Sequence, residues 1–217
     1  MSRLLLVGTL LAALTSSAVA RSFAQAPPAS SNAPAQIEKT STVNRAAVGA
    51  KLAKQRASNL QRFRAYRTKG SFPSNTYLNQ RLNVWIDADG RLCAAATIIS
   101  ASGMNTLVLQ TAQDNNFIRL GDVRDGALMN WILTSGLTQD EIAAIQEPFD
   151  PVYDEPMRGE PAPLAVAPAA RAAEDQRLAA RYKQVEQQIV RAQRASLDVA
   201  TDRLMAKPDL AAAFLRG

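Results

Sequence analysis

The 217-residue chain contains no histidine and only one cysteine, Cys93. Without histidine, the protein has no imidazole group to act as a general acid or base or to bind a metal ion. A single cysteine can form neither an internal disulfide nor a thiolate metal cluster. The chain also lacks a glycine-rich phosphate loop and a Gly-x-Ser-x-Gly nucleophile motif. We therefore expect no metal site, no cofactor and none of the common histidine-dependent reactions.

Proline is missing from the middle of the chain. None of the eleven prolines lies in residues 74–147. Proline interrupts helices and ladders, so a proline-free block that holds both tryptophans, Trp85 and Trp131, predicts the folded unit. We expect a globular core over residues 71–149, followed by a proline-rich linker over residues 150–170.

The beginning of the chain has the pattern of a secretory signal. Arg3 precedes an apolar run, and Ala18-Val-Ala20 supplies the small residues that signal peptidase recognises. The run is too short to span a bilayer as a stable helix. We expect residues 1–20 to be a signal peptide that is removed, and the mature protein to be exported, periplasmic or extracellular, without a membrane segment. Residues 21–40 are expected to be a disordered tether.

Positive and negative charges are separated along the chain. Residues 21–74 hold ten Lys or Arg and one acid, whereas residues 75–150 hold four Arg and nine acids. A basic helix is predicted over residues 41–70, because good helix formers dominate this segment and Gly70 is placed to end it. The cations of this basic arm are Arg45, Lys51, Lys54, Arg56, Arg62, Arg64, Arg67 and Lys69.

Like charges on one helix repel, so the basic arm needs compensating negative charge. One source is the acidic core, toward which the arm has an apolar helix face made by Val48, Leu52, Phe63 and Tyr66. The other is an anionic envelope component, such as a lipid head group or a polysaccharide. We prefer docking on the core, and we do not expect nucleic acid as a partner.

Within the core, the sequence predicts two short strands and several short helices. Residues 82–86 and 117–120 carry β-favouring side chains and are expected to pair. Residues 91–102 fit either a second hairpin strand or a helix capped by Asp89, and we prefer the helix. The remaining helices are expected over residues 106–113, 126–135 and 138–146, and Thr138 and Glu141 form a capping box for the last one.

A long amphipathic helix is predicted over residues 171–206, with a tail over residues 207–217. Apolar side chains recur on one face of this helix at heptad-like spacing: Leu178, Tyr182, Val185 and Ile189. We expect this seam to form a coiled coil with a second copy of the chain or to dock on a partner protein. The predicted fold class is mostly helical α+β: a small core of short helices with a minimal two-stranded β element, flanked by the basic helix and the long C-terminal helix.

Five carboxylates are the only candidate catalytic groups: Asp87, Asp89, Asp114, Asp122 and Asp125. A desolvated pair of carboxylates can act as general acid and base. Asp and Asn also favour turns, and we prefer that interpretation here. Our first hypothesis is an exported non-catalytic binding or structural protein that associates through its amphipathic helices. The alternatives are an envelope enzyme that uses these carboxylates and a binder of anionic envelope components through the basic arm.

The signal-peptide interpretation predicts that the mature chain begins at Arg21, because the Ala-x-Ala site ends at Ala20. N-terminal sequencing of the protein recovered outside the cytoplasm measures this directly. Recovery of a chain that still begins at Met1 would contradict the expected export.

Overall fold

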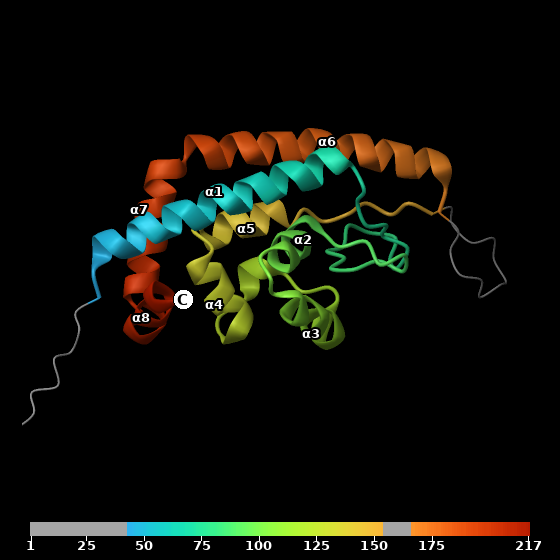
Figure 1. Cartoon of the computed structure of the whole chain (residues 1–217). Helices are drawn as coiled ribbons and strands as arrows, with labels where there is room; N and C mark the ends of the chain where they lie inside the picture. Colours follow the sequence, from blue (N-terminus) through green and yellow to red (C-terminus); the bar gives the residue numbers. More distant parts are fainter. Residues whose placement is uncertain (1–42, 154–165) are drawn as a thin grey trace, which may run out of the picture. The chain divides into compact units, whose positions relative to one another are not determined.

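Helices make up most of the parts of the chain that the computed structural model describes, residues 43–153 and 166–217 (Figure 1). In chain order they are α1 (Arg45–Lys69), α2 (Ala94–Ala101), α3 (Asn105–Asn115), the 3-10 turn η1 (Leu120–Asp122), α4 (Gly126–Thr134), α5 (Gln139–Ile145), α6 (Pro168–Arg191), α7 (Gln193–Met205) and α8 (Pro208–Arg216). The predicted signal peptide and tether, and most of the predicted linker, lie outside these residues.

Helix α1 is the element that most of the other helices contact. Asn44 caps its start by accepting the amide of Ala47, and Gly70 ends it in the left-handed conformation, as predicted. α1 packs against α2, α6, α7 and α8. Figure 1 shows it running alongside α6. The apolar face of the basic arm is buried, so the arm docks within the chain. We preferred docking on the core, but of its acidic partners only Glu141 lies there, whereas Glu186 and Asp202 lie in the C-terminal helices.

The predicted two-stranded β element is wrong. Extended pairing within the described residues is limited to isolated bridges, which join Asn75 to Pro151, Leu82 to Phe149, Ile86 to Leu92 and Tyr153 to Val166. Residues 82–86 and 117–120 meet only near Asn116, whose carbonyl accepts the amide of Trp85 at 2.8 Å. The two segments do not form a ladder because side-chain amides bond the backbone groups that the ladder would use. Asn116 bonds both backbone groups of Ile86, and Gln146 bonds Ile118 and Leu120.

The helix preferred for residues 91–102 is confirmed as α2, but its cap differs from the prediction. Cys93, not Asp89, is the N-cap, and its sulfur accepts the amide of Ala96. The competing hairpin is reduced to the bridge between Ile86 and Leu92. The capping box of α5 is present as predicted.

The predicted single C-terminal helix is interrupted at Ala192, where α6 ends and α7 begins in a new direction (Figure 1). The segment expected to be a tail forms α8, which starts at Pro208. These helices are not detached from the core, because α6 and α7 pack on α1, α4 and α5. Their apolar side chains belong to the same hydrophobic cluster as those of α1 and the central helices.

One buried cation joins α1 to the helices around it. The Arg56 guanidinium donates to both carboxylate oxygens of Glu141 at 2.7 Å, to the Gly136 carbonyl at 3.1 Å and to the Ile189 carbonyl at 2.7 Å. The turn at Gly136 lies directly on α1, since a Cβ there would lie 2.2 Å from the Leu52 carbonyl oxygen. Glycine is therefore required at this position by both the contact and its positive φ.

The contact with Arg56 affects the pKa of the Glu141 carboxyl. Burial alone would raise its pKa, but the hydrogen bonds from Arg56, the Thr138 amide and the Ser196 hydroxyl outweigh burial and hold the pKa below its usual value. A carboxyl with a lowered pKa in the folded state stabilises the fold at neutral pH. This contribution is lost as the pH falls through the folded-state pKa.

Replacing Arg56 with Met should destabilise the protein by about 3–5 kcal/mol, because Glu141 would be left without its buried partner. Urea denaturation measures the change in the free energy of unfolding. The control is Arg64→Met on the same helix. Arg64 pairs with Glu186 but is 52% exposed, so the expected loss is only about 0–1 kcal/mol. Equal losses in the two variants would contradict the central role of Arg56.

Candidate functional site

Asp87 is a structural carboxylate. It is buried, and its oxygens accept the backbone amides of Ser74, Asp89 and Arg91 at 2.8–3.0 Å. The Arg91 guanidinium donates to it as well. Because these donors from its own chain surround Asp87, its carboxylate shapes the turn before α2. No group of three potential metal ligands occurs among the described residues.

The other four candidate carboxylates are exposed to solvent. Asp89 pairs with Arg91 at 2.8 Å, and Asp122 pairs with Arg119 at 3.5 Å. Asp114 and Asp125 line one hollow of about 230 Å³. Both remain hydrated, whereas a catalytic acid is typically held in a water-poor pocket. The structure thus brings two of the five carboxylates to one hollow without the surroundings of a catalytic pair.

Cys93 and the two tryptophans belong to the core. Burial raises the pKa of the Cys93 thiol to about 12, so the reactive thiolate is scarce at neutral pH. The indole of Trp85 donates to the Val108 carbonyl at 3.0 Å, and that of Trp131 donates to the Ser102 hydroxyl at 3.1 Å. Buried indoles that are already bonded within the protein do not form a stacking platform for a ligand.

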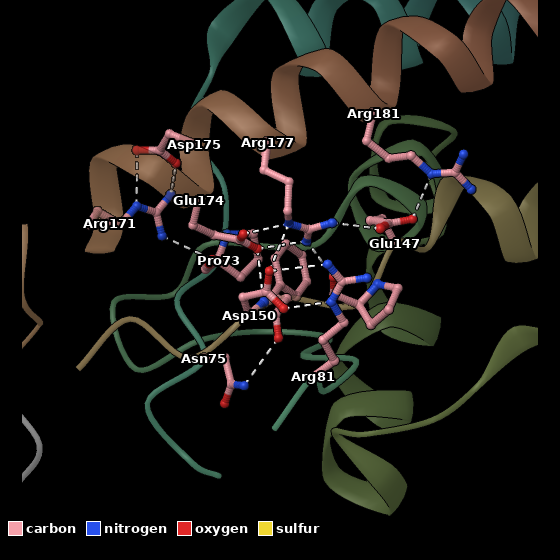
Figure 2. Close-up of polar contacts among 12 residues, drawn as sticks. Pro73, Asn75, Arg81, Glu147, Asp150, Arg171, Glu174, Asp175, Arg177 and Arg181 are labelled. Atoms are coloured by element: carbon pink, nitrogen blue, oxygen red, sulfur yellow. Dashed lines mark hydrogen bonds and ion pairs between the residues drawn. The ribbon is translucent and has the colours of Figure 1, made fainter. Parts of the chain in front are cut away.

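A network of ion pairs fastens the start of α6 to the loops beside it (Figure 2). Arg177 bridges Glu147, Asp150 and Glu174, and Arg81 donates to Asp150 at 2.6 Å. The hydrogen bond from Arg81 is the main reason why the pKa of Asp150 is lowered. Arg181 pairs with Glu147 as well. Each acid in this network has a cation, so we assign it a structural role.

At the N-terminal end of α6, Arg171 pairs with Asp175 and donates to the Phe72 and Pro73 carbonyls (Figure 2). Sequence reasoning missed this network, since it counted charges by segment and did not pair them. The spacing of Glu174, Arg177 and Arg181 on one helical face was the available signal.

A basic groove lies beside α1 and has a volume of about 460 Å³. Three cations from two parts of the chain line it: Arg62 and Lys69 of α1, and Arg91 of the turn before α2. The rest of its lining is mostly small or apolar and comprises Ala65, Tyr66, Ser71, Gly90, Leu92, Thr97 and Ala101. Arg62 and Lys69 were predicted as parts of the basic arm, but their proximity to Arg91 has no signal in the sequence.

The cations of the basic arm fall into two groups. Several are used for docking: Arg45 pairs with Asp202, Arg56 with Glu141, and both Arg64 and Arg67 with Glu186, while Lys51 lies over the Phe214 ring. Within the described part of the chain, Lys54, Arg62 and Lys69 have no acidic partner, and Arg62 donates only to the Asn59 side chain. Two of these three line the basic groove.

The predicted association seam of the C-terminal helix is internal. Leu178, Tyr182 and Val185 are fully buried and Ile189 is nearly so. The Tyr182 ring contacts the rings of Phe63, Tyr66 and Phe72. The heptad-like spacing therefore reflects packing against α1 within the same chain, and these four side chains present no exposed surface to a second molecule.

Comparison with protein-family models, curated proteins and solved structures finds no match to this chain. In residues 43–153 and 166–217, no helix has both the length and the apolar character needed to cross a membrane.

Cys93 should react slowly with a thiol reagent such as 5,5′-dithiobis(2-nitrobenzoate) in the native protein and rapidly in denaturant, because it is buried and its pKa is raised. The absorbance of the released thiolate measures both rates. Rapid labelling of the native protein, with unchanged circular dichroism, would show that the thiol is accessible.

Proposed function

We propose that the protein is an exported, non-catalytic binding protein that takes up an organic anion in the basic groove. The single observation that carries this proposal is the arrangement of Arg62, Lys69 and Arg91 around an apolar floor. Arg91 is paired with Asp87 and Asp89, whereas Arg62 and Lys69 have no acidic partner among the described residues. Cations attract the charged end of a ligand, and the floor receives its apolar part. A volume of about 460 Å³ suits a small molecule.

Among anionic envelope components, this arrangement favours an amphiphile with a lipid-like head group over a polysaccharide. Leu92 and Ala101 present apolar surface that a lipid-like tail can cover and that sugar hydroxyls cannot bond. The basic arm supplies both the docking contacts and two of the groove's cations. The sequence offered docking and anion binding as alternatives, and this proposal assigns the paired cations to docking and Arg62 and Lys69 to the ligand.

Export itself rests on the signal-like pattern of residues 1–20, which lie outside the described residues. The alternative of an envelope enzyme is supported only by the hollow that Asp114 and Asp125 share, and both carboxylates are exposed. A homo-oligomer or a complex through the C-terminal helix would have to use surfaces other than the buried seam.

Two fluorescent probes that share one ring system test the proposal. 8-Anilinonaphthalene-1-sulfonate carries a negative charge, whereas N-phenyl-1-naphthylamine is neutral. We expect saturable binding of the sulfonate to the native protein, weaker by about two- to fivefold in Lys69→Gln, because an exposed charge contributes up to about 1 kcal/mol. Binding of the neutral probe should be weak and unchanged by the substitution. Fluorescence titration measures both affinities.

Lys54→Gln is the matched control. Lys54 lies on the same helix, is exposed and has no acidic partner in the described residues, but it does not line the groove. An equal loss of sulfonate affinity in Lys54→Gln would show that net charge, not the groove, attracts the probe. Unchanged affinity in Lys69→Gln and in Arg62→Gln would overturn the proposal.

A further inference from the structure

A second hollow separates the two segments that were predicted to pair as strands. Residues 81–83 form one wall, and Phe117 and residues 119–121 form the opposite wall. Ala143, Gln146 and Pro148 complete this edge hollow, which has a volume of about 380 Å³. The two walls come together at the Trp85–Asn116 hydrogen bond.

The backbone of residues 81–83 is paired on one side only. Leu82 exchanges both of its backbone hydrogen bonds with Phe149, at 3.1 and 2.9 Å. In an extended segment, the backbone groups of the two neighbouring residues then face the other way. Within the described parts of the chain, no hydrogen bond uses the backbone N–H or C=O of Arg81 or Asn83. The Asn83 side-chain oxygen is also buried without a partner.

The opposite wall is extended only at Arg119, because the 3-10 turn η1 begins at Leu120. Arg119 has φ −107° and ψ 115°, and no hydrogen bond among the described residues uses its N–H. Each wall has three consecutive residues that line the same hollow. Because successive side chains of an extended segment point to opposite faces, the wall at residues 81–83 is formed in part by the backbone itself. The edge hollow therefore has one wall, residues 81–83, whose outward backbone groups have no hydrogen-bond partner among the described residues. In the opposite wall, Gln146 and Gln139 already bond the backbone of Leu120.

Exposed aromatic side chains stand at the rim of the edge hollow. Phe117 lines it and is 39% exposed, and the neighbouring Tyr77 is 38% exposed. The two rings make an edge-to-face contact, with their centroids 5.2 Å apart. The loops that carry them are held firmly, since Asn75 accepts the amide of Tyr77 and Asn115 accepts that of Phe117. Apolar side chains fixed in an exposed position are typical of interaction sites.

Of the two cations that line the edge hollow, Arg119 is the one available to a ligand. The guanidinium of Arg81 is held by Asp150 (Figure 2). Arg119 is 75% exposed, and its ion pair with Asp122 is long at 3.5 Å and highly solvated. A carboxylate from a partner can therefore replace Asp122 at little cost.

We infer that the edge hollow binds an extended peptide segment of a partner protein by strand addition. The peptide backbone bonds the N–H and C=O groups of Arg81 and Asn83 that face away from Phe149, a carboxylate pairs with Arg119, and an apolar side chain packs on Phe117. Backbone pairing gives affinity in this mode, and flanking side chains give specificity. A sugar or a small anion would leave this pattern of backbone donors and acceptors unused. The inference concerns a different surface from the basic groove and does not depend on it.

A phage-displayed library of random heptapeptides, selected on the full mature chain, tests this inference. We expect enriched peptides to combine an Asp or Glu with β-branched or aromatic residues. Synthetic copies are then methylated at single backbone nitrogens. Because alternate amides of a strand face the same side, methylation in one register should weaken binding by about tenfold or more, and methylation in the other register should have little effect. Fluorescence polarisation measures the affinities.

Arg119→Gln should weaken binding of the acidic peptides by about two- to fivefold, through loss of an exposed charge pair. Arg194→Gln removes an exposed charge from α7 and should leave binding unchanged. The inference is overturned if no peptide is enriched, if methylation has the same effect in both registers, or if Arg119→Gln and Arg194→Gln behave alike.

Discussion

The structure depends on the placement of one buried cation, the guanidinium of Arg56. It is bound at once by the carboxylate of Glu141 in α5, by the carbonyl that precedes α5 and by the last turn of α6. A buried charge without partners costs several kcal/mol, so α1 can pack only where all three elements are present. Asn59 adds a bond from α1 to the Ser135 carbonyl at 2.9 Å in the same turn. The polar residues on the inner face of α1 thus specify which turn it packs against, a task that apolar contacts perform poorly because they are not directional.

The position of the basic groove follows from this placement. Pairs with Glu141 and Glu186 fix the sides of α1 that face α5 and α6. The remaining edge of the helix, with Arg62 and Lys69, then lies beside the turn that carries Arg91. Arg62 and Lys69, which have no acidic partner in the described part of the chain, repel one another. They persist here because the buried contacts of α1 contribute more to stability than exposed charges cost. The groove is therefore a consequence of how α1 is anchored on its other sides.

Local signals in the sequence predicted local structure well. The end of α1 at Gly70, the capping box of α5 and the helical state of residues 94–101 each depend on a few neighbouring residues. The wrong predictions depend on distant residues. Pairing of residues 82–86 with residues 117–120 fails because side-chain amides, including one from position 146, occupy the backbone groups that a ladder needs. Likewise, the heptad-like spacing in α6 is compatible with a partner helix, but it does not indicate whether that helix belongs to the same chain.

The two proposed sites differ in chemistry and are joined by one short segment. Asn83 lines the edge hollow, and Gly90 to Leu92 line the basic groove. Between them, Trp85 is held at its amide by Asn116, at its carbonyl by the Cys93 amide and at its indole by Val108. A segment fixed at three points transmits little movement, so occupation of one site has no evident means of changing the other. The sites also respond differently to salt: side-chain charges are screened over about 10 Å at 0.1 M, whereas backbone pairing is much less affected. Independent sites of this kind suit a protein that holds an anionic ligand and a peptide partner at the same time.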